Sequence, residues 1–262
     1  MSKFLFAVAL VVMAPLSNGL FGGKEVDQDP LLARIPELTV AQVAARYAQR
    51  LGGDGALRDM DSIRLRLEIR RDSGDLVRMT VLKKRPDRVR IMFSQQGINI
   101  TQAFDGQTAW VRNQGQGIDR IRHMDSEEAE RFIRDAPIEH VLLHAERMNA
   151  ELKMVGRVRH SNRPCYEIHA HFANGDRYEL LIDAEEFVDR RISRIIRRAD
   201  GYTRTDIIPS RFEYISGILF ALRYVYFIDG KRDSIVDVVE ATVNPGLIEE
   251  IFRIPATPNA VP

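Results

Sequence analysis

The 262-residue chain has little cysteine and no surplus of either charge. Its single cysteine, Cys165, excludes an internal disulfide and the thiolate cluster of a structural zinc site, so stability must come from burial. Lysines and arginines number 38 and aspartates and glutamates 37, so no excess positive charge exists to neutralise a phosphate backbone, and we expect no nucleic-acid partner. Hydrophobic residues make up 45% and charged residues 29%, which excludes a disordered or polytopic membrane protein.

The N-terminus carries an apolar run, residues 4–16, that is too short to cross a bilayer. It has about 13 residues, whereas a spanning helix needs roughly 20. Lys3 precedes the run, and the small residues Ser17 and Gly19 follow it, which is the layout of a secretory signal peptide. An uncleaved anchor is the alternative interpretation. We expect a cleavable signal peptide at residues 1–19 and a periplasmic mature protein.

The rest of the chain divides into a leader, one domain and a tail. Residues 20–38 contain glycines and prolines without a clean period, which predicts a flexible leader. We expect a single domain over residues 39–255 and a C-terminal tail at 256–262. The domain opens with an amphipathic helix, because Thr39 can form a capping box with Gln42, and apolar residues recur on one face.

Beyond this helix the apolar residues alternate with polar ones at a period of two, which is typical of strands with one buried face. Turn residues such as Asn174-Gly175 and Asp229-Gly230 separate the runs. A helical stretch interrupts them, where Ser126 can cap one helix and Pro137 can open another. The pattern predicts a mainly β protein, one curled antiparallel sheet of about 11 to 12 strands whose hydrophobic side the helices cover.

Two segments go beyond these patterns. Lys84-Arg85-Pro86-Asp87 and the segment Asp105-Gly106-Gln107-Thr108-Ala109-Trp110-Val111-Arg112-Asn113 resemble the Lys-Arg-Pro-Asn and Asp-Gly-Lys-Thr-x-Trp-x-x-Asn motifs of the LolA-like family of periplasmic outer-membrane lipoprotein-sorting carriers. The resemblance spans about residues 39–255. The chain departs from the family at Gln114, where LolA has a proline, and in an extended final hairpin from Ile218 to Asn244.

The resemblance implies a half-open β-barrel with a helical lid over a hydrophobic cavity. Such a protein is a carrier or chaperone without enzymatic activity or a cofactor, and it binds the acyl chains of lipoproteins or lipids in transit to the outer membrane. Its partners would be an inner-membrane donor complex and an outer-membrane acceptor, with transient membrane-surface contact. The resemblance assigns Arg85 as the latch of the lid, because its guanidinium can bond several carbonyls at once. A lipid-sensing or protein-binding module of envelope-stress signalling is the alternative function.

Apolar and aromatic residues of the expected strands are candidates to line the cavity or to form ordinary core. These residues are Leu67, Met79, Ile91, Phe93, Phe104, Trp110, Ile168, Leu180, Phe212, Tyr214, Phe220 and Tyr224.

Enzyme chemistry is less well supported by the sequence. His140 and His144 lie four apart and can share a helix face as in a zinc hydrolase, but the general-base position after the first histidine holds Val141. We therefore expect a solvated or capping pair and no metal. His169 and His171 share one strand face and can also bind metal, although a polar face is the simpler interpretation. Cys165 is expected to be a small strand residue rather than a nucleophile.

A basic run allows two further interpretations. It can meet anionic head groups, or it can form a solvated strand face. The run comprises Arg190, Arg191, Arg194, Arg197 and Arg198.

Overall fold

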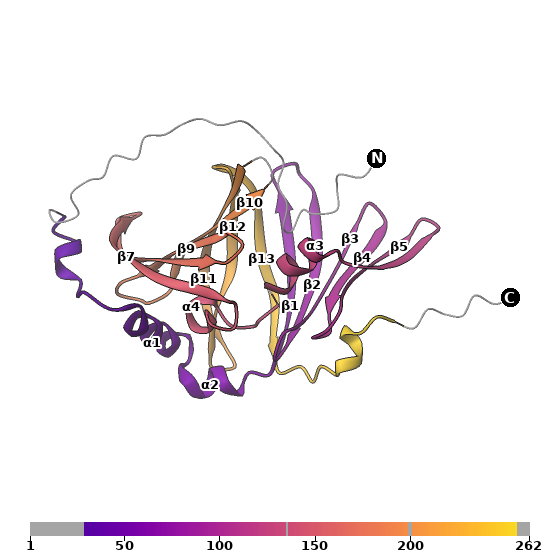
Figure 1. The fold of residues 1–262 in the computed structure, drawn as a ribbon, viewed down its shortest axis with the longest axis horizontal. Coiled ribbons are helices and arrows are strands. Elements are labelled where there is room, and N and C mark those ends of the chain that lie inside the picture. The colour runs from indigo at the N-terminus through magenta and orange to yellow at the C-terminus, as the bar shows by residue number, and fades with distance from the viewer. Residues whose placement is uncertain (1–28, 135, 199–200, 256–262) are drawn as a thin grey trace.

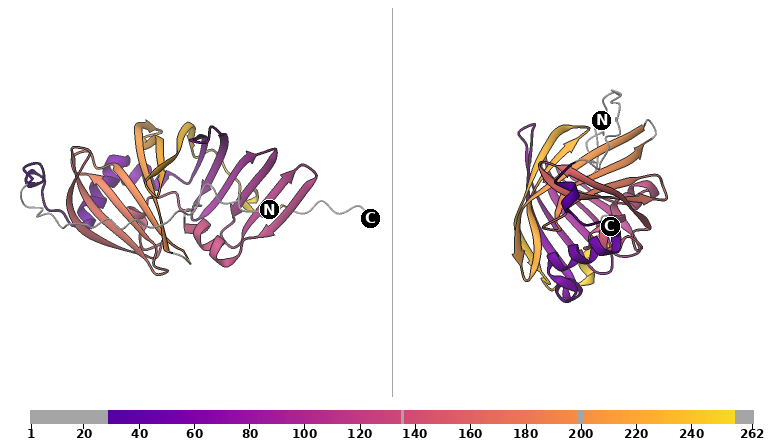
Figure 2. Two further views of the ribbon diagram at one scale, coloured as in Figure 1. Left: turned by 90° about the horizontal axis from the view of Figure 1, so that it is seen from above. Right: turned by 90° about the vertical axis from the view of Figure 1, so that its left-hand side faces the viewer.

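The computed structural model describes residues 29–134, 136–198 and 201–255 (Figure 1). Within these ranges, 13 strands form one antiparallel sheet. The expected signal peptide and C-terminal tail lie outside the described residues. The sheet is open and curled (Figure 2) and carries few helices, so the predicted half-open barrel with a helical lid is confirmed.

The strands fall into two arms that follow one another along the chain. The first arm comprises β1 (Ser62–Arg71), β2 (Leu76–Lys84), β3 (Arg88–Gln95), β4 (Ile98–Phe104), β5 (Ala109–Gly115) and β6 (Ile118–His123). The second arm comprises β7 (Ala150–His160), β8 (Arg163–Phe172), β9 (Arg177–Asp183), β10 (Asp189–Arg198), β11 (Gly201–Ile215), β12 (Ile218–Ile228) and β13 (Lys231–Val243).

The order of strands in the sheet is β6-β5-β4-β3-β2-β1-β13-β12-β11-β10-β9-β8-β7. The chain therefore runs from the centre to one edge, crosses to the opposite edge, and returns to the centre, where β13 pairs with β1. Asn244 reinforces this junction: its side-chain carbonyl accepts from the backbone N–H groups of Asp61 and Ser62 at 2.8 and 3.1 Å. The crossing segment between β6 and β7 contains two of the helices.

The helices are short. They are α1 (Val40–Leu51), α2 (Gly53–Asp59), α3 (Ser126–Arg134) and α4 (Val141–His144), with 3-10 turns η2 (Leu32–Arg34) and η3 (Glu249–Phe252). The predicted capping box of α1 is confirmed, because the Thr39 and Gln42 side chains each bond the other's backbone N–H. No helix of the described ranges is long and apolar enough to span a membrane.

Three local features differ from the sequence predictions. The glycine pair after α1 ends that helix, but Gly53 immediately begins α2, which was not predicted. The edge strand β6 was also missed, because most of its residues are polar and exposed. At α3, Ser126 is the first helical residue, and Asp125 accepts from the Glu128 backbone N–H in its place.

Part of the expected flexible leader packs on the domain. Leu32 and Ile35 are buried, because their apolar side chains join the core beside β8. The Tyr166 hydroxyl donates to the Pro36 carbonyl at 2.9 Å, and Arg157 donates to the Ile35 carbonyl at 2.8 Å. Residues 29–38 are therefore ordered by contacts that the glycines and prolines of the sequence did not indicate.

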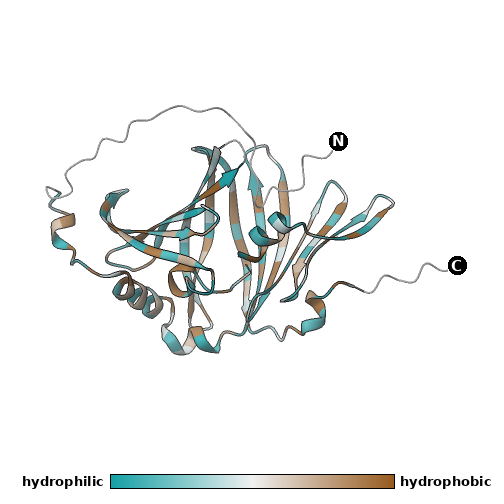
Figure 3. Cartoon of the chain, viewed as in Figure 1, coloured by the Kyte–Doolittle hydropathy of each residue, from teal (hydrophilic) through white to brown (hydrophobic). Residues whose placement is uncertain are grey.

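One face of the sheet, here called the inner face, can be followed from strand to strand by the cross-strand pairs, because paired residues point to the same side. The residues that mark it are Ile168, Leu180, Ile192, Ile207, Tyr226, Ser234, Val236, Ile69, Val77, Met79, Phe93 and Ile100. Helices α1, α3 and α4 all pack against this face. Figure 3 shows the alternation of hydrophobic and hydrophilic residues along the strands.

Candidate functional site

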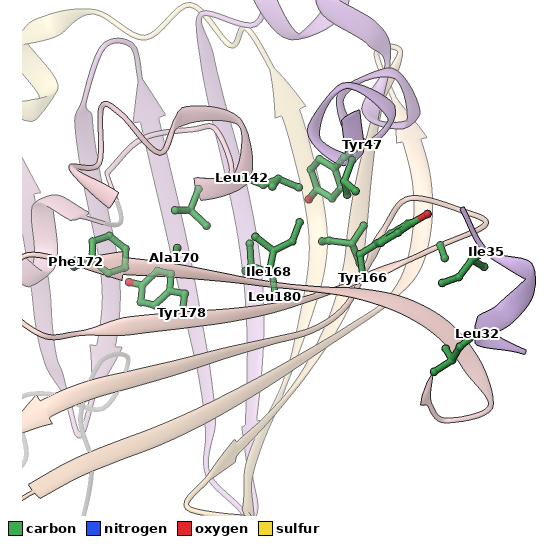
Figure 4. Packing of buried hydrophobic residues seen from close by; sticks show 14 residues of the cluster. Leu32, Ile35, Tyr47, Leu142, Tyr166, Ile168, Ala170, Phe172, Tyr178 and Leu180 are labelled. Carbon is green, nitrogen blue, oxygen red and sulfur yellow. The ribbon is translucent and has the colours of Figure 1, made fainter. Parts of the chain in front are cut away.

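The inner face of β7 to β10 is sealed by helices. Ile168 and Leu180 are 0% exposed there, beneath Val43 and Tyr47 of α1 and Leu142 of α4. Figure 4 shows Tyr47 and Leu142 pointing toward these strand residues. This part of the inner face is packed core.

The inner face of β3 to β5 has a second cover. Ala129, Phe132 and Ile133 of α3 pack against buried residues of these strands, among them Ile100 and Phe104. A bidentate ion pair between Arg122 of β6 and Glu128, at 2.5 and 2.9 Å, holds the start of α3 to the sheet edge.

Between the two covers lies a continuous apolar surface, which we call the inner strip. It spans both arms across the β1–β13 junction, and every residue in it comes from a strand. Within the described residues, no helix contributes a side chain to this cluster. The inner strip consists of Leu65, Leu67, Ile69, Val77, Met79, Val81, Ile91, Phe93, Tyr224, Tyr226 and Val236. Six of these are only partly buried: Leu65, Leu67, Ile91, Phe93, Tyr224 and Tyr226.

The structure divides the twelve cavity candidates among these surfaces. Five belong to the inner strip: Leu67, Met79, Ile91, Phe93 and Tyr224. Ile91 and Phe93 also pack against the cluster under α3, where the two surfaces meet. Phe104 lies under α3, and Ile168 and Leu180 lie under α1 and α4. Phe220 is half-buried and has the strand parity of Tyr224, so it lies on the inner face toward the β11–β12 turn.

The other three candidates lie on the outer face and cannot line the inner one. Trp110 alternates with Ala109 and Val111 along β5, and its indole N–H donates to the carbonyl of Phe252 in η3 at 2.8 Å. Phe212 and Tyr214 pair with Ala221 and Leu219, which alternate with Tyr224 along β12. Tyr214 is 54% exposed, and its hydroxyl donates to the Arg50 carbonyl at the end of α1.

Arg85, the expected latch, joins α2 to the residue before the α4 cap. It lies between β2 and β3, where its two terminal nitrogens donate to the carbonyls of Leu57 and Arg58 at 2.8 and 2.7 Å. Those carbonyls are in the last turn of α2, where helix carbonyls lack partners and a cation is favoured. The Arg85 Nε donates at 2.7 Å to Glu139, whose side chain is 4% exposed and directly precedes the α4 cap.

A cavity of about 590 Å³ opens beside the free edge of the first arm. It is lined by Val111, Asn113, Asp119, Arg120, Ile121 and Arg122. None of the twelve cavity candidates lines it.

The residues considered for enzyme chemistry have structural partners. The His140 Nδ1 accepts from the Leu142 backbone N–H at 3.3 Å and so caps α4, and the His144 Nε2 lies 3.7 Å from the Glu139 carboxylate. Capping is therefore the role of His140. Burial raises the pKa of the Cys165 thiol to about 11, which disfavours the nucleophilic thiolate.

His169 lies close to two carboxylates as well as to His171, the partner considered from the sequence. Ligand atoms of Glu167, His169 and Glu179 lie within 4.8 Å of one another on the outer face. The Glu179 carboxylate accepts from Arg177 at 2.7 Å and Arg204 at 3.0 Å, so a network of ion pairs already satisfies it. Burial alone would raise the pKa of Glu179, but these guanidiniums hold it below its ordinary value.

The basic run on β10 is divided between the two faces of the sheet. The Arg190 Nε donates to Asp183 at 2.7 Å, and the Arg194 guanidinium lies 5.2 Å from the centre of the Tyr178 ring. The run is therefore not one solvated face.

Several residues that shape this region were not identified from the sequence. Asp189 and Glu139 are buried carboxylates that meet lid residues, and Tyr47 contacts Asp189 across 142 positions of the chain. In the sequence, the signal for Asp189 was that an acidic residue directly precedes the basic run of β10.

Comparisons with known proteins support the architecture. No protein-family model matches the sequence, and a search of curated proteins finds no match. A LolA superfamily protein from Nitrosomonas europaea aligns with a TM-score of 0.58 at 14% identity, covering 83% of this chain and 99% of that one. A domain from Vibrio parahaemolyticus named for outer membrane lipoprotein sorting aligns with a TM-score of 0.56 at 8% identity, covering 80% and 94%.

A DUF1329 family protein from Desulfovibrio piger is similar to the same extent, with a TM-score of 0.57 at 14% identity over 86% of this chain and 98% of that one. The three solved structures thus match at least 80% of this chain. At these identities the likeness concerns the fold, and the chain has the LolA-like fold.

Proposed function

We propose that this protein binds the acyl chains of lipids or lipoproteins on the inner strip and shields them from water as a carrier between the inner and outer membranes. The observation that carries the proposal is the uncovered apolar surface between two helix-covered ones. The two covered surfaces include side chains of α1, α4 or α3, whereas the inner strip consists of strand residues alone, six of them partly exposed.

The dimensions of the inner strip suit an extended chain. The inner strip crosses five neighbouring strands, β3, β2, β1, β13 and β12, and at about 4.8 Å between strands it spans roughly 20 Å, enough for an extended acyl chain of moderate length. Each methylene transferred from water onto such a surface contributes about 0.8 kcal/mol. Binding by burial alone requires no covalent step and no cofactor.

Arg85 would act as the latch of this site. We use the term lid for α1, α2 and residues 136–144. The bonds of Arg85 to α2 and Glu139 tie this lid to the β2–β3 turn, and they must break if the lid moves to admit a chain. Three charge-assisted hydrogen bonds are strong enough to favour the closed lid and are still reversible.

The cellular setting is part of the proposal. The N-terminal pattern favours export to the periplasm, and the neighbours named for lipoprotein sorting and for the LolA superfamily favour lipoprotein or lipid cargo. A donor at the inner membrane and an acceptor at the outer membrane would then complete the route.

Native mass spectrometry of the protein purified from periplasm without detergent tests the proposal directly. We expect mass shifts that lipid extraction assigns to a lipid or lipoprotein. A protein that stays free of cargo after challenge with lipidated substrates would contradict it and favour a protein-binding module of envelope-stress signalling instead.

A matched pair of variants locates the binding surface. Leu67→Asn places an amide on the inner strip and should weaken binding of a fluorescent fatty acid about tenfold or more, because a buried amide without a partner is costly. Leu76→Asn is the control, because Leu76 is 49% exposed and pairs with Arg70 on the outer face. Equal affinities for both variants, with folding checked by circular dichroism, would remove the inner strip as the site.

Arg85→Leu tests the latch separately. We expect faster release of bound cargo, since the lid loses its bonds to α2 and Glu139. Arg78→Leu is the control, because Arg78 makes an exposed ion pair with Glu68. Unchanged transfer and release by Arg85→Leu would eliminate the latch while leaving lipid binding intact.

A further inference from the structure

A buried carboxylate on the sheet meets two separate pieces of the lid. Asp189 begins β10, pairs with Ile182 and thus lies on the inner face. Its Oδ2 accepts a hydrogen bond from the Tyr47 hydroxyl of α1 at 2.6 Å, and its Oδ1 lies 3.5 Å from the Nε2 of His140, the cap of α4. The Tyr47 and His140 rings are 5.2 Å apart between centroids. Asp189 therefore joins α1 and α4 to the sheet at one point.

The hydrogen bonds around His140 fix which nitrogen carries the proton. Nδ1 accepts from the Leu142 backbone N–H, so in the neutral ring the proton is on Nε2, directed at Asp189. Within the described residues, neither His140 Nε2 nor Asp189 Oδ1 has a hydrogen-bond partner. The 3.5 Å separation exceeds an ordinary hydrogen bond, so the contact is weak and can be broken.

The Tyr47 contact is the firmer one. Burial, followed by the Asp189 charge, raises the pKa of Tyr47 well above its ordinary value, so its hydroxyl remains a donor at neutral pH. Tyr47 is 3% exposed, and a buried carboxylate that lost this donor would be left without a hydrogen-bond partner.

Adjacent residues connect this contact to the Arg85 latch. Glu139 binds Arg85 at the β2–β3 turn of the first arm, and His140 faces Asp189 in the second arm. The Lys83 ammonium also donates to the Pro137 carbonyl at 2.9 Å. Residues 136–140 consequently bridge the two arms of the sheet, with one fastening at each end.

The Asp189 contact lies two strands from the inner strip, because β10 pairs with β11, and Pro209 of β11 pairs with Tyr224 of the inner strip. Burial raises the pKa of Tyr224, an inner-strip residue, with smaller contributions from Tyr226 and from the Asp189 charge. A chain that entered the inner strip beside Tyr224 would therefore meet the Asp189 cluster.

We propose that Asp189 is the second fixed point of the lid, a positioning residue that holds α1 and residues 136–144 against the sheet beside the inner strip, and that a ligand chain reaching past Tyr224 displaces them by breaking the Tyr47 and His140 contacts. The inference rests on the proposed function insofar as this lid borders the inner strip. It assigns the lid two fastenings on opposite arms: Arg85 holds α2 and Glu139, while Asp189 holds α1 and His140.

Tyr47→Phe tests this inference, because it removes the donor and keeps the ring. Hydrogen exchange of the α1 amides in the full chain without ligand should be about tenfold faster, as should association of a dansyl-labelled fatty acid measured by stopped flow. Tyr166→Phe is the matched control: its hydroxyl lies in the same core but bonds the Pro36 carbonyl. Its α1 exchange and its association rate should stay near those of the unmodified protein.

Asp189→Asn supplies a second measurement if Tyr47→Phe folds poorly. It should also speed α1 exchange, and the double variant should add little, because both changes act on one contact. Unchanged α1 exchange in folded Tyr47→Phe and Asp189→Asn would overturn the inference. If the unmodified protein binds no fatty acid, the proposed function fails, yet the exchange measurements still decide whether Asp189 fastens the lid.

Discussion

The inner face of β8 and β9 and the inner strip are built from the same alternation of apolar residues, but only the first is sealed by helices. Ile168 belongs to a cluster that includes side chains of α1 and α4, whereas Leu67 packs against a cluster of strand residues and stays partly exposed. Strand periodicity therefore establishes which side chains share a face. Whether that face becomes core or a binding surface depends on which part of it the helices reach.

The largest expected effect separates stability from binding. Ile168→Ala should reduce the free energy of unfolding by about 3 kcal/mol, because it creates a cavity beneath α1 and α4. Leu67→Ala should cost only about 1 kcal/mol, since Leu67 already contacts solvent, but it should weaken fatty-acid binding more. Urea unfolding and fluorescence titration of both variants measure the two quantities. Parallel losses of stability and affinity would mean that the two surfaces do not differ in function.

A smaller effect is expected at the joint between α1 and α2. Gly52 has a φ of 135°, and a Cβ there would lie 2.3 Å from the Gly217 carbonyl oxygen in the β11–β12 turn. Gly52→Ala should therefore destabilise the covered region by about 2 kcal/mol and loosen α1 against β12. Gly55→Ala is the control. Gly55 lies in α2, where an added Cβ would meet no other side chain or distant backbone atom within 4 Å, so the alanine should stabilise the protein by about 0.5 kcal/mol. Thermal unfolding that changes equally in both variants would contradict the close contact.

The smallest expected effect is that of low pH, which should destabilise the second arm of the sheet before the first. Buried carboxylates with lowered pKa values, Glu179 and Asp183, lie in the second arm, and there arginines and backbone N–H groups outweigh the opposing effect of burial. Such groups stabilise the fold above their unfolded pKa values, ordinarily 4.5 and 3.8, and lose that contribution as pH falls through their folded values.

We therefore expect hydrogen exchange near pH 3 to accelerate first in the second arm. Glu179→Gln should flatten the decline in stability on the acid side of the unfolding profile, because it removes one of the groups that must be protonated. Earlier loss of protection in the first arm would be the contrary result.

Much of the fold could be predicted because its signals are local. The Thr39 capping box and the Asn174-Gly175 turn each depend on neighbours in sequence, and both form as expected, with the Gly175 backbone N–H donating to the Phe172 carbonyl. The strand β6 escaped prediction because an edge strand buries few side chains, so its sequence lacks a strong alternation.

The assignment of side chains to faces was less accurate because some strands are buried on both sides. Ala109, Trp110 and Val111 are all buried, so their periodicity does not say which side Trp110 takes. Its cover is η3, which lies far away in the sequence. The Asp189 cluster likewise joins residues from three distant segments, and such a meeting is fixed by tertiary structure rather than by local pattern.

The single ladder between the arms has a consequence for how the protein is made. Strand pairs within each arm are hairpins of consecutive strands. The pairing of β1 with β13 instead joins residues far apart in the sequence, such as 63 and 243, so it can form only after β13 has been synthesised. During synthesis the first arm can assemble early, yet β1 remains an unpaired edge until nearly the whole chain has emerged. The inner strip crosses this junction, so it is completed only in the final step of folding.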